Sequence, residues 1–175
     1  MDVRYAPYLL DPNTPPEGKA RRAMTHPADG PTEMEKRAES LGIKFTRGRT
    51  WTSNSLLALE TAAFAAEHPL RDEFHSALFK CYFTDLGDIG QVDTLVEIAD
   101  GIGMDGAALR SALDDHTYRD EVEQGLGLAR EIGISSVPTF VIDDQYAVLG
   151  AQDLLVFTDL FKRLEKTPLK GVQAE

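Results

Sequence analysis

The residues best suited to chemistry are few, and the first is the single cysteine, Cys81. One thiol cannot close an intramolecular disulfide, form a C-x-x-C redox pair or supply a four-cysteine zinc site. Cys81 also shares a helical stripe with Phe74, Leu78 and Tyr82. Because a free cysteine on such a face packs as a small hydrophobic residue, the sequence predicts a packing role for Cys81 and identifies no catalytic residue.

Histidines and paired carboxylates are the next candidates, as metal ligands or as acid and base groups. No two of the four histidines are four residues apart, the spacing that places two ligands on one helical face. Asp114-Asp115 and Asp143-Asp144 are adjacent pairs at an expected helix end and an expected turn, where aspartates hydrogen-bond the local backbone. The sequence therefore predicts no metal site.

The tripeptide Val137-Pro138-Thr139 stands where a proline meets a predicted strand. A trans proline is tolerated at the first position of a strand. A cis proline, selected by tertiary structure, would instead present the main-chain N–H and C=O of Val137 to an extended peptide or to glutathione. Gln152 lies just before a predicted helix, where backbone N–H groups can hold a carboxylate, although a plain capped turn explains it equally well.

The elements that must position these residues follow from apolar periodicity and turn signals. Residues 3–10 are typical of a strand, and a proline-rich loop follows to Gly30. Two β-branched and aromatic runs, 139–142 and 146–149, predict a β-hairpin. Amphipathic spacing and capping residues predict helices over about 32–42, 54–68, 74–82, 92–99, 105–113, 117–132 and 153–164. A block of helices between strands is typical of an α/β core with an all-helical insertion.

The composition is that of an ordinary globular chain, of a length that suits one domain or one domain with an insertion. Its 175 residues include 18 basic and 29 acidic side chains, for a formal net charge of −11. This acidic balance excludes nucleic acid as a partner. No apolar run reaches the roughly 18 residues of a membrane span. Since the first residues also lack the pattern of a secretory signal, we expect a cytoplasmic protein with no membrane partner.

Several motifs together resemble one known family. They are Leu10-Asp11-Pro12-Asn13, Asn54-Ser55-Leu56-Leu57-Ala58, Tyr82-Phe83-Thr84, Asp88-Ile89-Gly90, Gly133-Ile134-Ser135-Ser136-Val137-Pro138-Thr139-Phe140-Val141-Ile142 and Gly150-Ala151-Gln152. In this order they look like the FrnE-like branch of the DsbA-like thioredoxin-fold family, which is related to 2-hydroxychromene-2-carboxylate isomerases and kappa-class glutathione transferases. The resemblance covers nearly the whole chain.

The resemblance implies a thioredoxin-like α/β core over residues 1–30 and 117–168, with a helical insertion over residues 31–116. It implies thiol–disulfide oxidoreductase chemistry, in which a thiolate attacks a substrate disulfide. It makes Pro138 the cis proline and places substrate at Val137, Pro138 and Gln152. The implied partners are a polypeptide disulfide or glutathione, and no cofactor is implied other than glutathione.

The chain departs from the family at its beginning. The family's first strand, C-x-x-C motif and following helix precede the matched part, so the isolated chain is expected to be inactive. Three explanations stay open: a truncated or misassigned start, a homodimer in which a second protomer supplies the strand, and a non-catalytic relic. Two alternative functions also stay open, namely glutathione-dependent isomerase or transferase chemistry and a non-catalytic binding module.

Overall fold

The computed structural model describes residues 3–23 and 28–164. The chain divides into two compact units, residues 11–124 and residues 1–10 with 125–175. The boundary falls within helix α6 (Arg119–Glu131).

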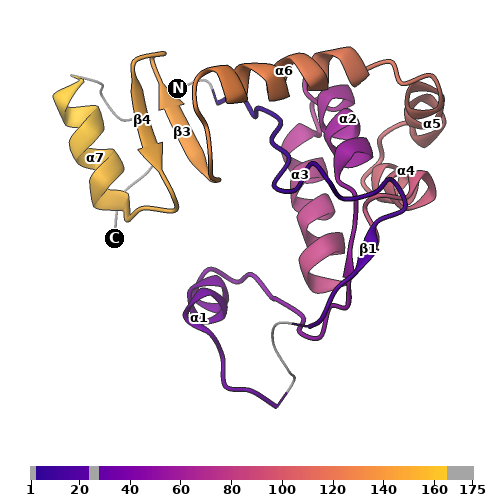
Figure 1. The fold of residues 1–175 in the computed structure, drawn as a ribbon, viewed down its shortest axis with the longest axis horizontal. Coiled ribbons are helices and arrows are strands. Elements are labelled where there is room, and N and C mark those ends of the chain that lie inside the picture. Colours follow the sequence, from indigo (N-terminus) through magenta and orange to yellow (C-terminus); the bar gives the residue numbers. More distant parts are fainter. Residues whose placement is uncertain (1–2, 24–27, 165–175) are drawn as a thin grey trace. The chain divides into compact units, whose positions relative to one another are not determined.

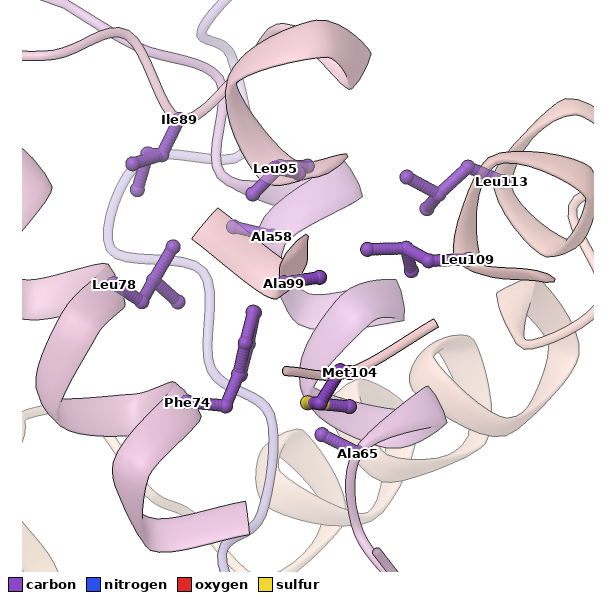
Figure 2. Close-up of a cluster of buried hydrophobic side chains, with 10 residues drawn as sticks. All are labelled: Ala58, Ala65, Phe74, Leu78, Ile89, Leu95, Ala99, Met104, Leu109 and Leu113. Carbon is purple, nitrogen blue, oxygen red and sulfur yellow. The ribbon is translucent and has the colours of Figure 1, made fainter. Parts of the chain in front are cut away.

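The larger unit is built on a bundle of four helices that pack against one another. They are α2 (Leu56–Phe64), α3 (Arg71–Phe79), α4 (Val92–Gly101) and α5 (Gly106–Asp114), shown in Figure 1. Figure 2 shows the side chains that they bury together, among them Phe74, Leu95 and Leu109, all of them fully buried. Since burial of each such side chain contributes about 1.5–3 kcal/mol, this cluster is the main stabilising core of the unit.

Local signals explain where these helices begin. The Asp105 carboxylate accepts from the Ala108 N–H at 2.9 Å and caps α5, a helix that the sequence predicts. The Asn54 side chain accepts from the Leu56 N–H at 2.9 Å at the start of α2. The α3 helix continues into a short π-helix, η1 (Lys80–Thr84), which contains Cys81. The sequence predicts one continuous helix here, and the π-turn was not foreseen.

A small arm, residues 28–49, carries the helix α1 (Glu33–Ser40). Thr32 and Glu35 form the predicted capping box at its beginning. The Arg47 guanidinium then binds the Glu35 carboxylate at 2.6 Å through both Nε and Nη2, and it also donates to the carbonyls of Asp29 and Gly30. The arm is thus held by its own residues and by η1, where the Thr46 N–H donates to the Phe83 carbonyl at 2.9 Å and the rings of Phe45 and Phe83 lie 5.1 Å apart.

At the base of the arm, strand β1 (Lys19–Ala20) pairs antiparallel with β2 (Trp51–Thr52). These two short strands were not predicted, because two residues carry no periodicity. Gly18, at φ +82°, lies against the Trp51 ring so closely that a Cβ atom there would be 2.6 Å from Nε1. Glycine is therefore required at this turn.

The smaller unit contains the predicted β-hairpin and the last helix. Strand β3 (Thr139–Ile142) pairs antiparallel with β4 (Tyr146–Leu149), and the turn residues Asp143 and Asp144 have positive φ. Helix α7 (Leu154–Arg163) packs on one face of the hairpin, where the rings of Phe140 and Phe157 meet edge to face at 4.9 Å. These elements confirm the prediction for residues 139–163.

The strand predicted over residues 3–10 is wrong. Residues 3–9 have no regular secondary structure, and in the described part of the chain β3 and β4 pair only with each other. A strand needs a neighbouring ladder, and Pro7 also lacks an N–H to donate to one. Pro7 instead packs against Gly125 of α6, where a Cβ atom would be 2.5 Å from its ring.

The two compact units divide the chain differently from the expected core and insertion, whose boundaries stay a prediction. Residues 11–30 and 117–124, which the resemblance assigns to the core, belong to the larger unit. Pairing of β1 with β2 ties the first of these segments to the start of the bundle. Residues 165–168 lie outside the described residues, as does the C-terminal tail.

Candidate functional site

The three predicted site residues lie at one end of the β-hairpin. The Pro138 carbonyl, just before β3, accepts from the Gly150 N–H, just after β4, at 2.8 Å. Gly150 has φ +78°, and this turn leads the chain on to Gln152. Antiparallel pairing therefore brings Val137, Pro138 and Gln152 together, although fourteen positions separate Pro138 from Gln152 in the sequence.

Val137 presents its main chain at this end of the hairpin. The Val137–Pro138 peptide bond is cis, and Val137 is 44% exposed. Within the described residues, the N–H and C=O of Val137 form no hydrogen bond. Such a pair of groups can take an extended peptide as an added strand.

Gln152 is engaged within its own turn. Its side-chain Nε2 donates to the Leu149 carbonyl at 2.7 Å, and its backbone N–H donates to the Gly150 carbonyl at 2.9 Å. Its Nε2 therefore stabilises the turn after β4, which is the structural role that the sequence left open. Its side-chain oxygen is the group that remains for a ligand.

Cys81 is poorly suited to act as a nucleophile. It is half-buried among the bundle's apolar side chains, and its sulfur lies directly against Gly87. Burial raises the pKa of the Cys81 thiol and Asp85 adds to the effect, while the charges of Arg49 and Lys80 act in the opposite direction. A reactive thiol needs a lowered pKa and an accessible sulfur, so the geometry supports the predicted packing role.

Asn54 and the predicted family motif around Asp88 are structural in this unit. The Asn54 amide donates to the Thr14 carbonyl at 2.7 Å and so ties the loop after residue 10 to the start of α2. Burial would raise the pKa of Asp88, but hydrogen bonds, among them those from the Gly90 N–H at 3.0 Å and the Gln91 side chain at 3.1 Å, outweigh it and hold that pKa below its ordinary value. Asp88 thereby stabilises the turn that precedes α4.

Sequence reasoning missed one buried charged group, Glu60 of α2, which is 1% exposed. Its carboxylate lies 2.8 Å from Nε of Arg119, and its other oxygen lies 3.2 Å from Nδ1 of His116. Glu60 falls on the apolar side of its helix, and an acidic residue at such a position is the signal that should have suggested a buried partner.

Residues 3–23 and 28–164 contain neither a cluster of metal ligands nor a membrane-spanning helix. No group of three or more His, Cys, Asp or Glu side chains there is placed to hold a metal ion. Over the same residues, no helix combines the length and the apolarity that a bilayer crossing requires. His26 lies outside the described residues. Two open hollows of about 560 and 620 Å³ lie in the larger unit, and neither is lined by a predicted site residue.

The chain is similar to two known proteins. The chain is 31% identical over 149 residues to the uncharacterized protein YwbO of Bacillus subtilis (strain 168), a match that covers 82% of this chain and 73% of that protein. It superimposes with a TM-score of 0.68 on the crystal structure of the probable DsbA oxidoreductase SCO1869 from Streptomyces coelicolor, at 28% identity and over 81% of this chain.

The chain spans 62% of the length of that Streptomyces protein. The sequence pattern of one family, the DSBA-like thioredoxin domain, matches residues 1–162. With its β-hairpin, closing helix and helical block, the fold is α/β and thioredoxin-like with a helical insertion. The chain belongs to the DSBA-like thioredoxin domain family.

Proposed function

We propose that this chain is the substrate-docking part of a thiol–disulfide oxidoreductase of the FrnE-like branch, and that its partner is a polypeptide disulfide. The observation that carries the proposal is the unbonded N–H and C=O of the exposed residue Val137. An extended substrate segment would pair with these two groups beside Pro138, and the side-chain oxygen of Gln152 would lie at the same end of the hairpin.

The isolated chain is not expected to turn over disulfides. The sequence has one cysteine, whereas release of a mixed disulfide in this chemistry needs a second thiol. The raised pKa of Cys81 further disfavours thiolate attack at neutral pH. A cytoplasmic location belongs to the same proposal, since a reducing compartment would keep this lone thiol free.

Binding of a short peptide closed by one cystine tests the docking role. Val137→Ala keeps the N–H of residue 137, whereas Val137→Pro removes it and leaves the C=O in place. Since an unmatched hydrogen-bonding partner costs roughly 1–3 kcal/mol, we expect Val137→Pro to weaken binding by about tenfold or more and Val137→Ala to bind nearly as the natural chain does. Absence of peptide binding, or equal binding by both variants, would contradict docking through the main chain.

Two further measurements separate the alternative functions. Glutathione disulfide is titrated under the same conditions, and if it binds while the cystine peptide does not, glutathione-dependent chemistry is supported instead. Insulin-disulfide reduction by the isolated chain is expected to equal the uncatalysed rate. If it exceeds that rate and Cys81→Ser abolishes the excess, the chain carries its own nucleophile and the docking-only proposal is wrong.

A further inference from the structure

A side-chain hydrogen bond ties the loop that carries Val137 to the first residue of β3. The hydroxyl of Thr139 donates to the Ser136 carbonyl at 2.7 Å. Thr139 is half-buried at the start of the strand, whereas Ser136 and Val137 are exposed. The bond therefore links the hairpin to the exposed segment whose main chain is the docking surface.

The bonded carbonyl and the Val137 N–H belong to one peptide group. The peptide bond between Ser136 and Val137 is trans, so its C=O and N–H lie in one plane and point in opposite directions. Because the carbonyl points to the Thr139 hydroxyl, the N–H points away from that side chain. A rotation of this peptide plane would redirect the N–H and break the bond. The Thr139 hydroxyl thus fixes the direction in which the Val137 N–H is presented.

The backbone fixes the other side of Val137. The Pro138 carbonyl accepts from the Gly150 N–H at 2.8 Å, across the end of the hairpin. Val137 is therefore held between two bonded carbonyl groups, while its own N–H and C=O stay unbonded within the described residues. Of these two contacts, the one from Thr139 is made by a side chain, so a substitution can remove it and keep the backbone pairing of the hairpin.

The same hydrogen bond strengthens the Val137 N–H as a donor. A carbonyl that accepts a hydrogen bond polarises its own peptide group, and this cooperative strengthening is about 10–30% per bond. Threonine suits the role, because its β-branched side chain has few rotamers and keeps the hydroxyl in place. Serine offers the same hydroxyl on a freer side chain, and valine offers nearly the same shape without a donor.

We propose that Thr139 is a positioning residue for docking, whose hydroxyl holds the Ser136–Val137 peptide plane so that the Val137 N–H meets an extended substrate segment. Thr139 acts through that N–H and does not itself contact the substrate. The inference rests on the proposed docking function and adds to it the side chain that prepares the main chain for binding.

Binding of the cystine-closed peptide by Thr139 variants tests the proposal. Thr139→Val removes the donor and keeps the β-branched shape, so we expect it to weaken binding by about three- to tenfold, the effect of one hydrogen bond. Thr139→Ser keeps the hydroxyl and should restore most of the affinity. The matched control is Thr158→Val, which removes the hydroxyl-to-carbonyl bond from Thr158 to Leu154, 3.0 Å long, within α7. This control should bind as the natural chain does.

A double-mutant cycle shows whether Thr139 acts through the Val137 N–H. Val137→Pro lacks that N–H, so the addition of Thr139→Val should weaken binding no further. A loss of the same size in both backgrounds would show that the hydroxyl contacts the peptide directly, and the positioning role would be wrong. Equal binding by the natural chain and Thr139→Val, or no recovery in Thr139→Ser, would contradict it as well.

Amide nitrogen relaxation of the free chain, measured by NMR, gives a readout that needs no peptide. The Val137 N–H should be as ordered as the amides of β3, more mobile in Thr139→Val and ordered again in Thr139→Ser. A mobile Val137 amide in the natural chain overturns the proposal even if the variants do not fold. If the natural chain binds no peptide, the docking function is wrong and the proposal falls with it. If it binds while the order of Val137 does not depend on Thr139, only the positioning role is wrong.

Discussion

The buried Glu60 carboxylate of α2 lies 2.8 Å from Nε and 2.7 Å from Nη2 of Arg119, at the beginning of α6. The Glu60 side chain is 1% exposed and that of Arg119 is 28% exposed, so the pair is largely removed from water. It joins the bundle to the helix that follows it, and His116 Nδ1 lies 3.2 Å from the second Glu60 oxygen.

Arg119→Met should therefore reduce the free energy of unfolding strongly. It leaves the Glu60 carboxylate buried without its guanidinium, a change that costs about 3–5 kcal/mol. The matched control is Arg110→Met, which breaks the exposed pair with Asp93 and should cost about 0–1 kcal/mol. Urea denaturation followed by circular dichroism measures both, and losses of equal size would contradict a special role for the buried pair.

The arm should open in acid as Glu35 titrates. Hydrogen bonds from Arg47, then from the Thr32 N–H and hydroxyl, lower the pKa of Glu35 from 4.5 to about 2. Because the folded pKa is the lower one, ionised Glu35 stabilises the arm fully at pH values above its ordinary pKa, and this contribution is lost as the pH falls toward 2.

A carboxyl-carbon NMR titration of Glu35 checks this prediction. The expected midpoint is about 2 in the natural chain, and Arg47→Met should move it upward toward 4.5. The same substitution should leave the bundle's unfolding transition nearly unchanged, because the hydrogen bonds of Arg47 to Glu35 and to the Asp29 and Gly30 carbonyls lie within the arm. A midpoint in the natural chain close to 4.5 would show that Arg47 does not bind Glu35 in solution.

Alanine substitutions at two glycines with nearly the same backbone conformation should distinguish the effect of backbone strain from that of a steric clash. Gly18 and Gly48 have φ of +82° and +84°, but a Cβ at Gly18 would meet Trp51, whereas one at Gly48 meets nothing within 4 Å. Gly48→Ala should lower the free energy of unfolding by about 1–2 kcal/mol, because alanine disfavours the left-handed backbone. Gly18→Ala should lower the free energy of unfolding by about 1–3 kcal/mol more, because the indole must also move.

Thermal unfolding of both glycine variants gives the comparison, and Trp51 is the only tryptophan of the chain. Its fluorescence should shift in Gly18→Ala and stay as in the natural chain in Gly48→Ala. Equal unfolding temperatures would show that the close approach of Gly18 to Trp51 does not occur.

Cys81 should react slowly with thiol reagents in the folded chain. Its sulfur is half-buried and its pKa is raised by burial, so the thiolate fraction at neutral pH is small. Alkylation by iodoacetamide should be much faster in urea than in buffer, and the folded rate should still rise as the pH increases beyond 9. A folded rate that reaches its plateau near neutral pH would identify an activated thiolate instead.

Local signals made much of the fold predictable. The capping box at Thr32 and the Asp143-Asp144 turn each act within a few residues, and the helix and the hairpin that they bound lie where the sequence predicted them. The prediction of a strand over residues 3–10 was wrong because it depends on a distant part of the chain. Its composition suits a strand, yet strand formation depends on a neighbour that composition does not specify.

The site residues stay a prediction, and the contacts around them could not be predicted from the sequence. The cis proline and its neighbour Val137 came from a family resemblance, since local sequence leaves the cis and trans forms open. The pairing of Glu60 with Arg119 spans 59 positions in the sequence, and no periodicity identifies such a partner. The hydrogen bond from Gln152 Nε2 to the Leu149 carbonyl could likewise not be predicted from the sequence, because it depends on the path of the turn.

The ladder at the base of the arm makes the first part of that arm a separable piece. The Arg21 N–H donates to the Thr50 carbonyl at 2.9 Å, next to the β1–β2 pair, so the chain leaves and rejoins the bundle at nearly one point. Residues 44–46 also bond to η1, whereas the length of the segment ahead of Lys44 can change with little effect on the path of the helices on either side, since loop length adds only a slowly growing entropic cost. Evolution or a protein engineer can shorten this excursion ahead of Lys44 and keep the bundle whole.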